Sequence, residues 1–154
     1  MSTTTRTRSI RLTIESCLED VFLLGLATRA ICSYAPLNQL TTYQIETCVV
    51  EAINNCIKHA YQNLPGNSVE VVISLFIDRI TFQVCDYGKS MEIEDFEKQK
   101  RKELDFDPDV LEQLPEGGMG LYVIRSVMEQ VEYCSAGGRN VLTMTKLFEK
   151  NQND

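Results

Sequence analysis

The sequence predicts a single α+β domain, a two-layer sandwich in which helices cover one face of a mixed, mostly antiparallel sheet. Three observations predict this fold. Apolar residues alternate with period two in several short runs, residues 44–61 show the period of an amphipathic helix, and turn-forming residues separate the elements in the order β-α-α-β-β-loop-α-β-β. We expect one domain over residues 1–154, with an ordered core over about 9–148.

Composition narrows the class of protein. The chain of 154 residues is 44% hydrophobic and 24% charged, which is typical of a globular protein with one substantial core. No apolar run approaches the roughly 18 residues of a membrane span, and residues 1–10 lack the apolar centre of a secretory signal. We therefore expect a cytoplasmic protein with no membrane partner. The net charge of −7 argues against nucleic acid as a direct ligand and leaves proteins and nucleotides as candidates.

The six cysteines indicate free thiols rather than a structural framework. They lie mostly within apolar stretches, and no pair has the CxxC spacing. This pattern favours buried thiols over disulfides. Because the chain has a single histidine, a zinc site is not expected.

The chain begins with a predicted strand and a predicted helix. Residues 9–15 alternate apolar and polar side chains, which is the pattern of a half-buried strand. Residues 17–34 form a helix so rich in apolar side chains that little of it should face water. Pro36, together with Asn38, ends this helix.

The amphipathic helix over residues 44–61 is the element around which the other predictions are organised. Thr41 or Thr42 is its expected N-cap, and the turn sequence at 63–67 ends it. Its apolar face is predicted to enter the core and consists of Ile45, Val49, Ala52, Ile53, Cys56 and Ala60.

Two hairpins are predicted in the second half of the chain. Residues 69–77 and 80–85 are β-rich runs joined by a short turn. Residues 131–134 and 140–148 form the final hairpin around a turn that contains two glycines. We expect both hairpins to belong to the same sheet.

A long charged segment, 89–116, separates the two hairpins and contains a short predicted helix at 93–102. A loop of this length inside a compact domain is typical of a lid or a binding segment. It leads into Glu116-Gly117-Gly118-Met119-Gly120, after which residues 121–128 are predicted to be helical. Glycines that open onto a helix N-terminus offer free N–H groups and a positive dipole end to an anion, so this segment predicts a phosphate site.

Two polar side chains of the helix over 44–61 are candidates for chemistry. Glu51 and Asn55 lie one turn apart and can point at one spot. A carboxylate there can accept a proton, and a carboxamide oxygen can coordinate a metal ion. The pair therefore favours a phosphate-handling site. The alternative is an ordinary amphipathic helix in which Asn54 and Asn55 have no role.

Asp86-Tyr87-Gly88 closes the predicted strand 80–85. The carboxylate stands at a strand end, where the glycine permits a turn and a close approach by a ligand. By itself the Asp-x-Gly pattern is a weak signal, because aspartate is common in turns for purely structural reasons.

Taken together, these three segments resemble a known family. Glu51-Ala52-x-x-Asn55 with His59-Ala60-Tyr61, then Asp86-x-Gly88, then residues 116–122 resemble the N, G1 and G2 boxes of the GHKL (Bergerat-type) ATP-binding fold, which gyrase, heat-shock chaperones and histidine kinases share. The resemblance is closest to anti-sigma factors of the RsbW and SpoIIAB type, the stand-alone serine-protein kinases of bacterial partner switches. It runs from about Ile10 to Lys146.

The resemblance implies ATP and Mg²⁺ as cofactors and gives roles to individual residues. Glu51 would be the general base, Asn55 the ligand that holds Mg²⁺ against the phosphates, and Asp86 the acceptor of the adenine amino group. Gly88 would let the base approach, and residues 89–116 would form an ATP lid. The implied nucleotide-binding residues are Asn55, Asp86, Gly88, Gly117, Gly118, Met119, Gly120 and Leu121.

The sequence departs from the family pattern at three places. Tyr87 stands where an acidic or polar residue is usual, and Asn54 replaces a small hydroxyl residue. Arg139-Asn140 stands where many members have Gly-Thr beside the adenine.

Two classes of function remain open on the sequence. The first is a kinase and anti-sigma factor, a homodimer in its relatives, that binds a sigma factor in one state and phosphorylates a serine of a STAS-type antagonist in the other. The second is a nucleotide-binding interaction module that sequesters partners without phosphoryl transfer. A histidine kinase and a gyrase-like or chaperone ATPase are disfavoured, because the sequence has no room for their additional segments.

Overall fold

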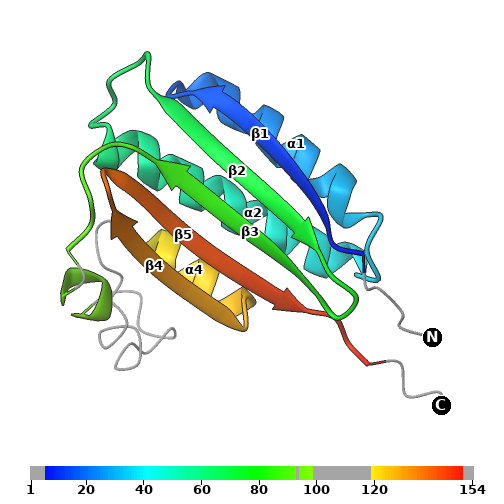
Figure 1. The fold of residues 1–154 in the computed structure, drawn as a ribbon. Coiled ribbons are helices and arrows are strands. Elements are labelled where there is room, and N and C mark those ends of the chain that lie inside the picture. Colours follow the sequence, from blue (N-terminus) through cyan, green and yellow to red (C-terminus); the bar gives the residue numbers. More distant parts are fainter. Residues whose placement is uncertain (1–5, 93, 99–118, 151–154) are drawn as a thin grey trace, which may run out of the picture.

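The structure is a computed structural model that describes residues 6–92, 94–98 and 119–150. These residues form two layers, a five-stranded sheet and a set of helices that cover one of its faces (Figure 1). The strand order is β1-β2-β3-β5-β4, and every pair of neighbouring strands in this described sheet is antiparallel. The predicted α+β class is confirmed, and the sheet is wholly antiparallel rather than mixed.

The order of the elements also agrees with the prediction. The strands are β1 Arg8–Glu15, β2 Ser68–Leu75, β3 Arg79–Asp86, β4 Gln130–Ala136 and β5 Arg139–Leu147. The helices are the 3-10 turn η1 Leu18–Asp20, α1 Val21–Cys32, α2 Gln39–Asn55, the π-helical turn η2 Cys56–Ala60, and α4 Met119–Val127. Residues 94–98 form a further short helical segment. Within the described residues, no helix is both long enough and apolar enough to span a membrane.

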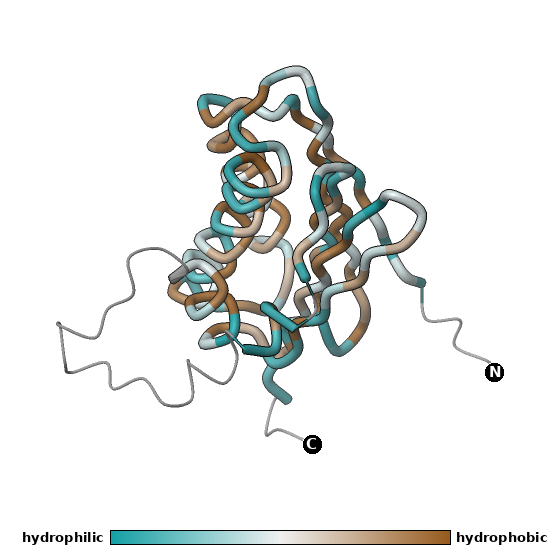
Figure 2. Tube along the Cα trace, turned by 90° about the vertical axis from the view of Figure 1, so that its left-hand side faces the viewer, coloured by the Kyte–Doolittle hydropathy of each residue, from teal (hydrophilic) through white to brown (hydrophobic). Residues whose placement is uncertain are grey.

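The core lies between the sheet and the helices, where Figure 2 shows apolar segments of both layers facing each other. Alternate residues of the strands enter it because successive strand side chains point to opposite faces. On β2 these are Val69, Val71 and Ile73, all at most 1% exposed. Antiparallel pairing places Ile14 opposite Val69 and Leu12 opposite Val71, so β1 contributes to the same face.

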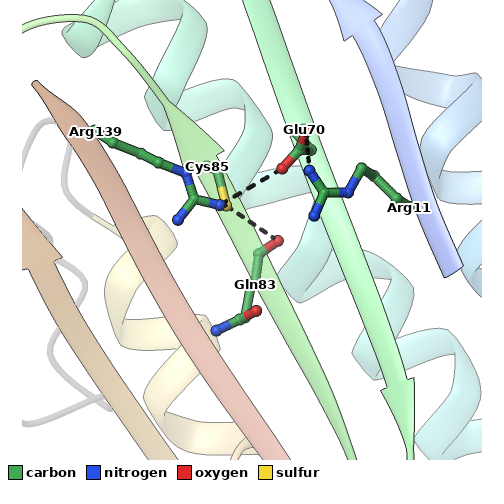
Figure 3. A network of polar contacts seen from close by, with 5 residues as sticks. All are labelled: Arg11, Glu70, Gln83, Cys85 and Arg139. Carbon is green, nitrogen blue, oxygen red and sulfur yellow. Dashed lines mark hydrogen bonds and ion pairs between the residues drawn. The ribbon is translucent and has the colours of Figure 1, made fainter. Parts of the chain in front are cut away.

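The opposite face of the sheet is polar and carries a network that links four strands (Figure 3). The carboxylate of Glu70 on β2 lies 3.1 Å from Nη1 of Arg11 on β1 and 3.6 Å from Nη2 of Arg139 on β5. Arg139 also donates to the Sγ of Cys85 on β3 at 3.2 Å. The two arginines neutralise a glutamate that is only 12% exposed, and a partly buried carboxylate is costly without such partners.

Helix α1 is more exposed than its apolar composition predicts. Phe22, Leu23 and Leu26 are 60%, 49% and 50% exposed, so the expectation that little of the helix faces water was wrong. The reason is geometric: a helix can bury only one stripe against a single underlying layer. The residues that occupy this stripe are Val21, Leu24, Gly25, Thr28 and Cys32.

Helix α2 lies between α1 and α4 on the sheet and begins earlier than predicted (Figure 1). Its N-cap is Asn38, whose side-chain oxygen accepts from the backbone N–H of Thr41 at 2.8 Å, so Thr41 and Thr42 are not the cap. Thr42 instead lies on the buried face. Asparagine at an N-cap accepts a hydrogen bond from an N–H group that the first turn leaves without a helical partner. The cap at Asn38 therefore starts helix α2 at Gln39.

All six cysteines are free, as predicted. Cys32, Cys48, Cys56 and Cys85 are buried, whereas Cys134 is exposed. Burial raises the pKa of both Cys32 and Cys48 to about 12, because a thiolate would lose its hydration. These two thiols therefore remain protonated and act as small apolar side chains.

Helix α2 does not end with a regular last turn but widens into the π-helical turn η2. The N–H of Tyr61 consequently donates to the carbonyl of Cys56, five residues back, at 2.9 Å. The buried phenol of Tyr61 donates to the carbonyl of Ser68 at 2.6 Å and accepts from the N–H of Tyr87 at 2.8 Å. One hydroxyl thus connects the end of the central helix to the start of β2 and to the chain just after β3.

We expect Tyr61→Phe to lower the free energy of unfolding by about 1–3 kcal/mol, because it leaves a carbonyl and an N–H without their partner at a partly buried site. Urea denaturation monitored by circular dichroism would measure the change. Tyr43→Phe is the matched control, since Tyr43 on α2 is 63% exposed and should tolerate the loss of its hydroxyl. Equal midpoints for the two variants would contradict the bridging role of Tyr61.

Candidate functional site

The candidate site begins where helix α2 faces the first turn of α4. A Cβ atom added at Gly120 would lie 3.0 Å from Oε2 of Glu51 and within 3.4–3.6 Å of the amide atoms of Asn55. The structure therefore brings together three of the residues singled out in the sequence. The backbone at Gly120 therefore approaches the carboxylate and the carboxamide closely, and a side chain at this position would crowd Glu51.

Packing in the core sets this arrangement. Leu121 and Ile124 on α4 are 4% and 0% exposed and hold the helix against the core. The thiol of Cys48 on α2 lies 3.9 Å from the carbonyl of Val123. The side chain of Leu121 points into the core, so a contact between this residue and a nucleotide would come from its backbone.

Glu51 and Asn55 are half-buried, and within the described part of the chain neither side chain forms a hydrogen bond. The described residues contain no group of three or more acidic, histidine or cysteine side chains that could enclose a metal ion. Mg²⁺ is commonly held by one or two protein oxygens together with phosphate oxygens and water, and a single carboxamide oxygen beside the N-terminal turn of a helix fits that mode.

The second part of the site is the end of β3. Asp86 is buried, with 6% of its surface exposed. Its Oδ1 accepts from Nδ2 of Asn140 at 2.7 Å and from the backbone N–H of Gly88 at 3.0 Å. A buried carboxylate is stable only with such donors. Asn140, which the sequence analysis noted only as a departure from a family pattern, is therefore part of the candidate site.

Gly88 is required by packing as well as by any approach of a ligand. A Cβ atom on this residue would lie 2.4 Å from the carbonyl oxygen of Ala60 and 2.6 Å from its carbonyl carbon. The N–H of Lys89 donates to the same carbonyl at 2.9 Å. The widened turn η2 and the chain after β3 are thus in direct backbone contact, which any side chain at position 88 would disrupt.

The two parts of the site lie at the same end of the core. Cys56, the residue after Asn55, is buried beside Asp86, and burial together with the charge of that carboxylate raises the pKa of the thiol. Cys56 therefore stays neutral and is no nucleophile. Lys58 and His59, on the polar side of the same turn, are exposed.

The described start of the predicted lid packs against the core. Phe96 is 7% exposed, and its ring lies 4.5 Å from the guanidinium carbon of Arg125 on α4 and 5.9 Å from the ring of Tyr133 on β4. The N–H of Met91 donates to the hydroxyl of Tyr133 at 2.8 Å. The rest of the predicted lid, and Gly117 and Gly118 after it, lie outside the described residues. Met119 is the first residue of α4.

Sequence reasoning did not find the roles of Tyr61 and Asn140. Asn140 was predicted to begin the last strand, but the pairing of β5 with β3, which sets Asn140 opposite Asp86, connects residues 54 positions apart. A correct strand order would have shown this pair. No local signal in the sequence marks the two hydrogen bonds of the Tyr61 hydroxyl.

Comparison with known proteins identifies the family. Residues 5–146 match the model of the histidine kinase-like ATPase domain. The chain is 32% identical over 131 residues to a serine-protein kinase RsbW of Bacillus cereus, covering 84% of this chain and 76% of that protein. It is 35% identical over 136 residues to an RsbW of Bacillus licheniformis, covering 86% and 78% of the two chains.

The fold is also similar to that of solved structures. A chain of the SiaB-SiaC complex from Pseudomonas aeruginosa superposes with a TM-score of 0.58 over 88% of this chain and 89% of that one, at 15% sequence identity. At this identity the likeness concerns the fold alone. The family match and the identity to the RsbW proteins extend over most of the chain. The protein therefore belongs to the histidine kinase-like ATPase domain family and, within it, to the RsbW-type serine-protein kinases.

Proposed function

We propose that this serine-protein kinase works in a bacterial partner switch. It sequesters a sigma factor in one state, and in the other it uses ATP and Mg²⁺ to phosphorylate a serine of a STAS-type anti-sigma antagonist. The observation that carries the proposal is the close approach of Gly120, at the first turn of α4, to the side chains of Glu51 and Asn55, with Asp86 buried at the same end of the core. Since a sigma factor acts in the cytoplasm, we place the protein there.

The adenine end of the site is proposed to form around Asp86. Its Oδ1 is already engaged by Asn140 and by the N–H of Gly88, which leaves Oδ2 to accept from the amino group of adenine. An ionised acceptor forms a stronger hydrogen bond than a neutral one. Gly88 keeps this approach free of a side chain.

The phosphate end is proposed to form between α2 and α4. Asn55 offers its side-chain oxygen to Mg²⁺, which would neutralise charge on the phosphates. Gly120 brings the first turn of α4, where backbone N–H groups lack helical partners, close to Glu51 and Asn55 without a side chain in between. We extend the phosphate-binding role to the neighbouring residues Gly117, Gly118, Met119 and Leu121.

Glu51 is proposed as the general base. Its carboxylate forms no hydrogen bond within the described residues and faces the same space as Asn55, so it can accept the proton of a serine hydroxyl presented there. Holding the hydroxyl and the phosphate in one place supplies the rest of the rate enhancement. We further propose that residues 1–154 act as one domain with an ATP lid over 89–116, and that the protein is a homodimer.

We expect Asp86→Asn to weaken ATP binding about tenfold to a hundredfold, the range for a lost hydrogen bond to a charged group. The donors from Asn140 and Gly88 would hold the carbonyl of the new carboxamide, so its NH₂ would face the adenine amino group. Titration calorimetry with ATP and Mg²⁺ measures the affinity. Asp78→Asn, at a turn residue whose side chain is 62% exposed, is the matched control. Unchanged affinity in Asp86→Asn would remove Asp86 from the site.

We expect Glu51→Gln to keep ATP and sigma-factor binding but to slow phosphorylation of the antagonist by roughly 10²–10⁴-fold, the usual contribution of a general base. Asn55→Ala should differ by also losing the Mg²⁺-dependent part of ATP affinity. Transfer of radiolabelled phosphate to a co-purified STAS-type antagonist measures the rate, and calorimetry measures binding.

Glu132→Gln serves as the control for the Glu51 experiment, because Glu132 is an exposed glutamate on β4. If Glu51→Gln transfers phosphate as fast as this control, Glu51 is not the base. If the unmodified protein transfers no phosphate to the antagonist, the protein acts as a nucleotide-binding module without phosphoryl transfer.

A further inference from the structure

A relay of hydrogen bonds crosses three neighbouring strands and ends on Asp86. Ser135 on β4 is paired with Asn140 on β5, and Asn140 is paired with Asp86 on β3. The Oγ of Ser135 donates to Oδ1 of Asn140 at 2.7 Å, and Nδ2 of Asn140 donates to Oδ1 of Asp86 at 2.7 Å. Directly paired residues of antiparallel strands are close enough for short polar side chains to meet, which explains this alignment.

The surroundings of Asn140 determine the orientation of its amide. Nδ2 donates to the carbonyl of Gly88 at 3.0 Å as well as to Asp86. In the flipped orientation the amide oxygen would face these two acceptors, and two favourable hydrogen bonds would become repulsive contacts. Asn140 is only 2% exposed, so water cannot substitute for the lost partners. The donor side of the amide is therefore fixed toward Asp86.

The fixed amide in turn holds the carboxylate of Asp86. Oδ1 receives donors from two directions, Nδ2 of Asn140 and the N–H of Gly88, which opposes rotation of the carboxylate. Neither group, nor Ser135, engages Oδ2. The buried thiol of Cys56 also donates a hydrogen bond to this carboxylate. These donors hold the carboxylate in one direction, and because each carboxylate oxygen can accept more than one hydrogen bond, Oδ2 can still accept from a base.

We propose that Asn140, supported by Ser135, is a positioning residue that makes the site select a purine with an amino group at position 6 over a purine with a carbonyl there. The inference rests on the proposed function, in which Asp86 binds the base of ATP. Asn140 acts through Asp86 and needs no contact with the nucleotide.

The selectivity follows from how firmly the acceptor is held. An amino group donates to Oδ2, whereas a carbonyl at the same position brings an acceptor against an acceptor and leaves the carboxylate oxygen without a donor. A carboxylate that is free to rotate can turn away from the carbonyl or admit a bridging water. Loosening Asp86 should therefore weaken ATP binding while reducing the penalty against the carbonyl-bearing base.

The experiment compares the dissociation constants of ATP and of inosine triphosphate, which has a carbonyl at position 6, by titration calorimetry with Mg²⁺. We expect Asn140→Ala to lower the preference for ATP over inosine triphosphate about tenfold, as when one hydrogen bond to a charged group is lost. Ser135→Ala should lower it less, by about two- to fivefold, since it removes only the support of the amide. Because Ser135 is exposed, this second variant keeps the test valid if Asn140→Ala fails to fold.

Ser9→Ala is the matched control. Ser9 on β1 forms a cross-strand hydroxyl hydrogen bond with Ser74 on β2 at 2.8 Å, which does not lead to Asp86. The Ser9→Ala variant should prefer ATP over inosine triphosphate by the same factor as the unmodified protein. Equal losses of affinity for both nucleotides in Asn140→Ala and Ser135→Ala would show that Asn140 is only structural and would overturn the inference.

The Asp86→Asn variant tests the proposed function independently of the positioning role of Asn140. If Asp86→Asn weakens ATP binding but the preference stays unchanged in Asn140→Ala and Ser135→Ala, the positioning role fails and the ATP site stands. If Asp86→Asn binds ATP as the unmodified protein does, the site itself is wrong and the inference fails with it.

Discussion

The candidate site depends on one backbone contact, between the end of the central helix and the chain that leaves β3. The carbonyl of Ala60 accepts from the N–H of Lys89, and the backbone at Gly88 lies so close that no Cβ atom fits. This contact requires the widened turn η2, because η2 sets the position of the Ala60 carbonyl. It sets the helix that carries Glu51 and Asn55 against the strand that carries Asp86.

Around this contact, the buried polar groups are satisfied by partners from distant parts of the chain. The hydroxyl of Tyr61 donates to a carbonyl at the start of β2 and accepts from an N–H after β3. The amide of Asn140 donates both to the carboxylate of Asp86 and to the carbonyl of Gly88. A satisfied polar network in a site of low dielectric holds its members in one geometry. In this site the network holds the carboxylate of Asp86 at the same end of the core as Glu51 and Asn55.

Two predictions from the sequence were wrong for the same physical reason. The apolar composition of residues 17–34 predicted burial, but composition does not reveal how many layers pack against a helix, and Phe22 is exposed in consequence. Two threonines competed with Asn38 as the N-cap of α2, and the choice depended on where Pro36 and the preceding loop placed the chain. Both questions concern neighbours that a local pattern does not contain.

The sequence alone determined the class of fold, the order of the elements and the position of Glu51 and Asn55 on one side of the central helix. These follow from local periods: two in the strands, 3.6 in the helices, and one helical turn between the two residues. Only the tertiary structure decided the meeting of α2 with Gly120, the contact of Gly88 with Ala60, and the pairing of Asp86 with Asn140. These contacts join residues far apart in the chain. Their geometry is set by strand order and core packing, which no local pattern encodes.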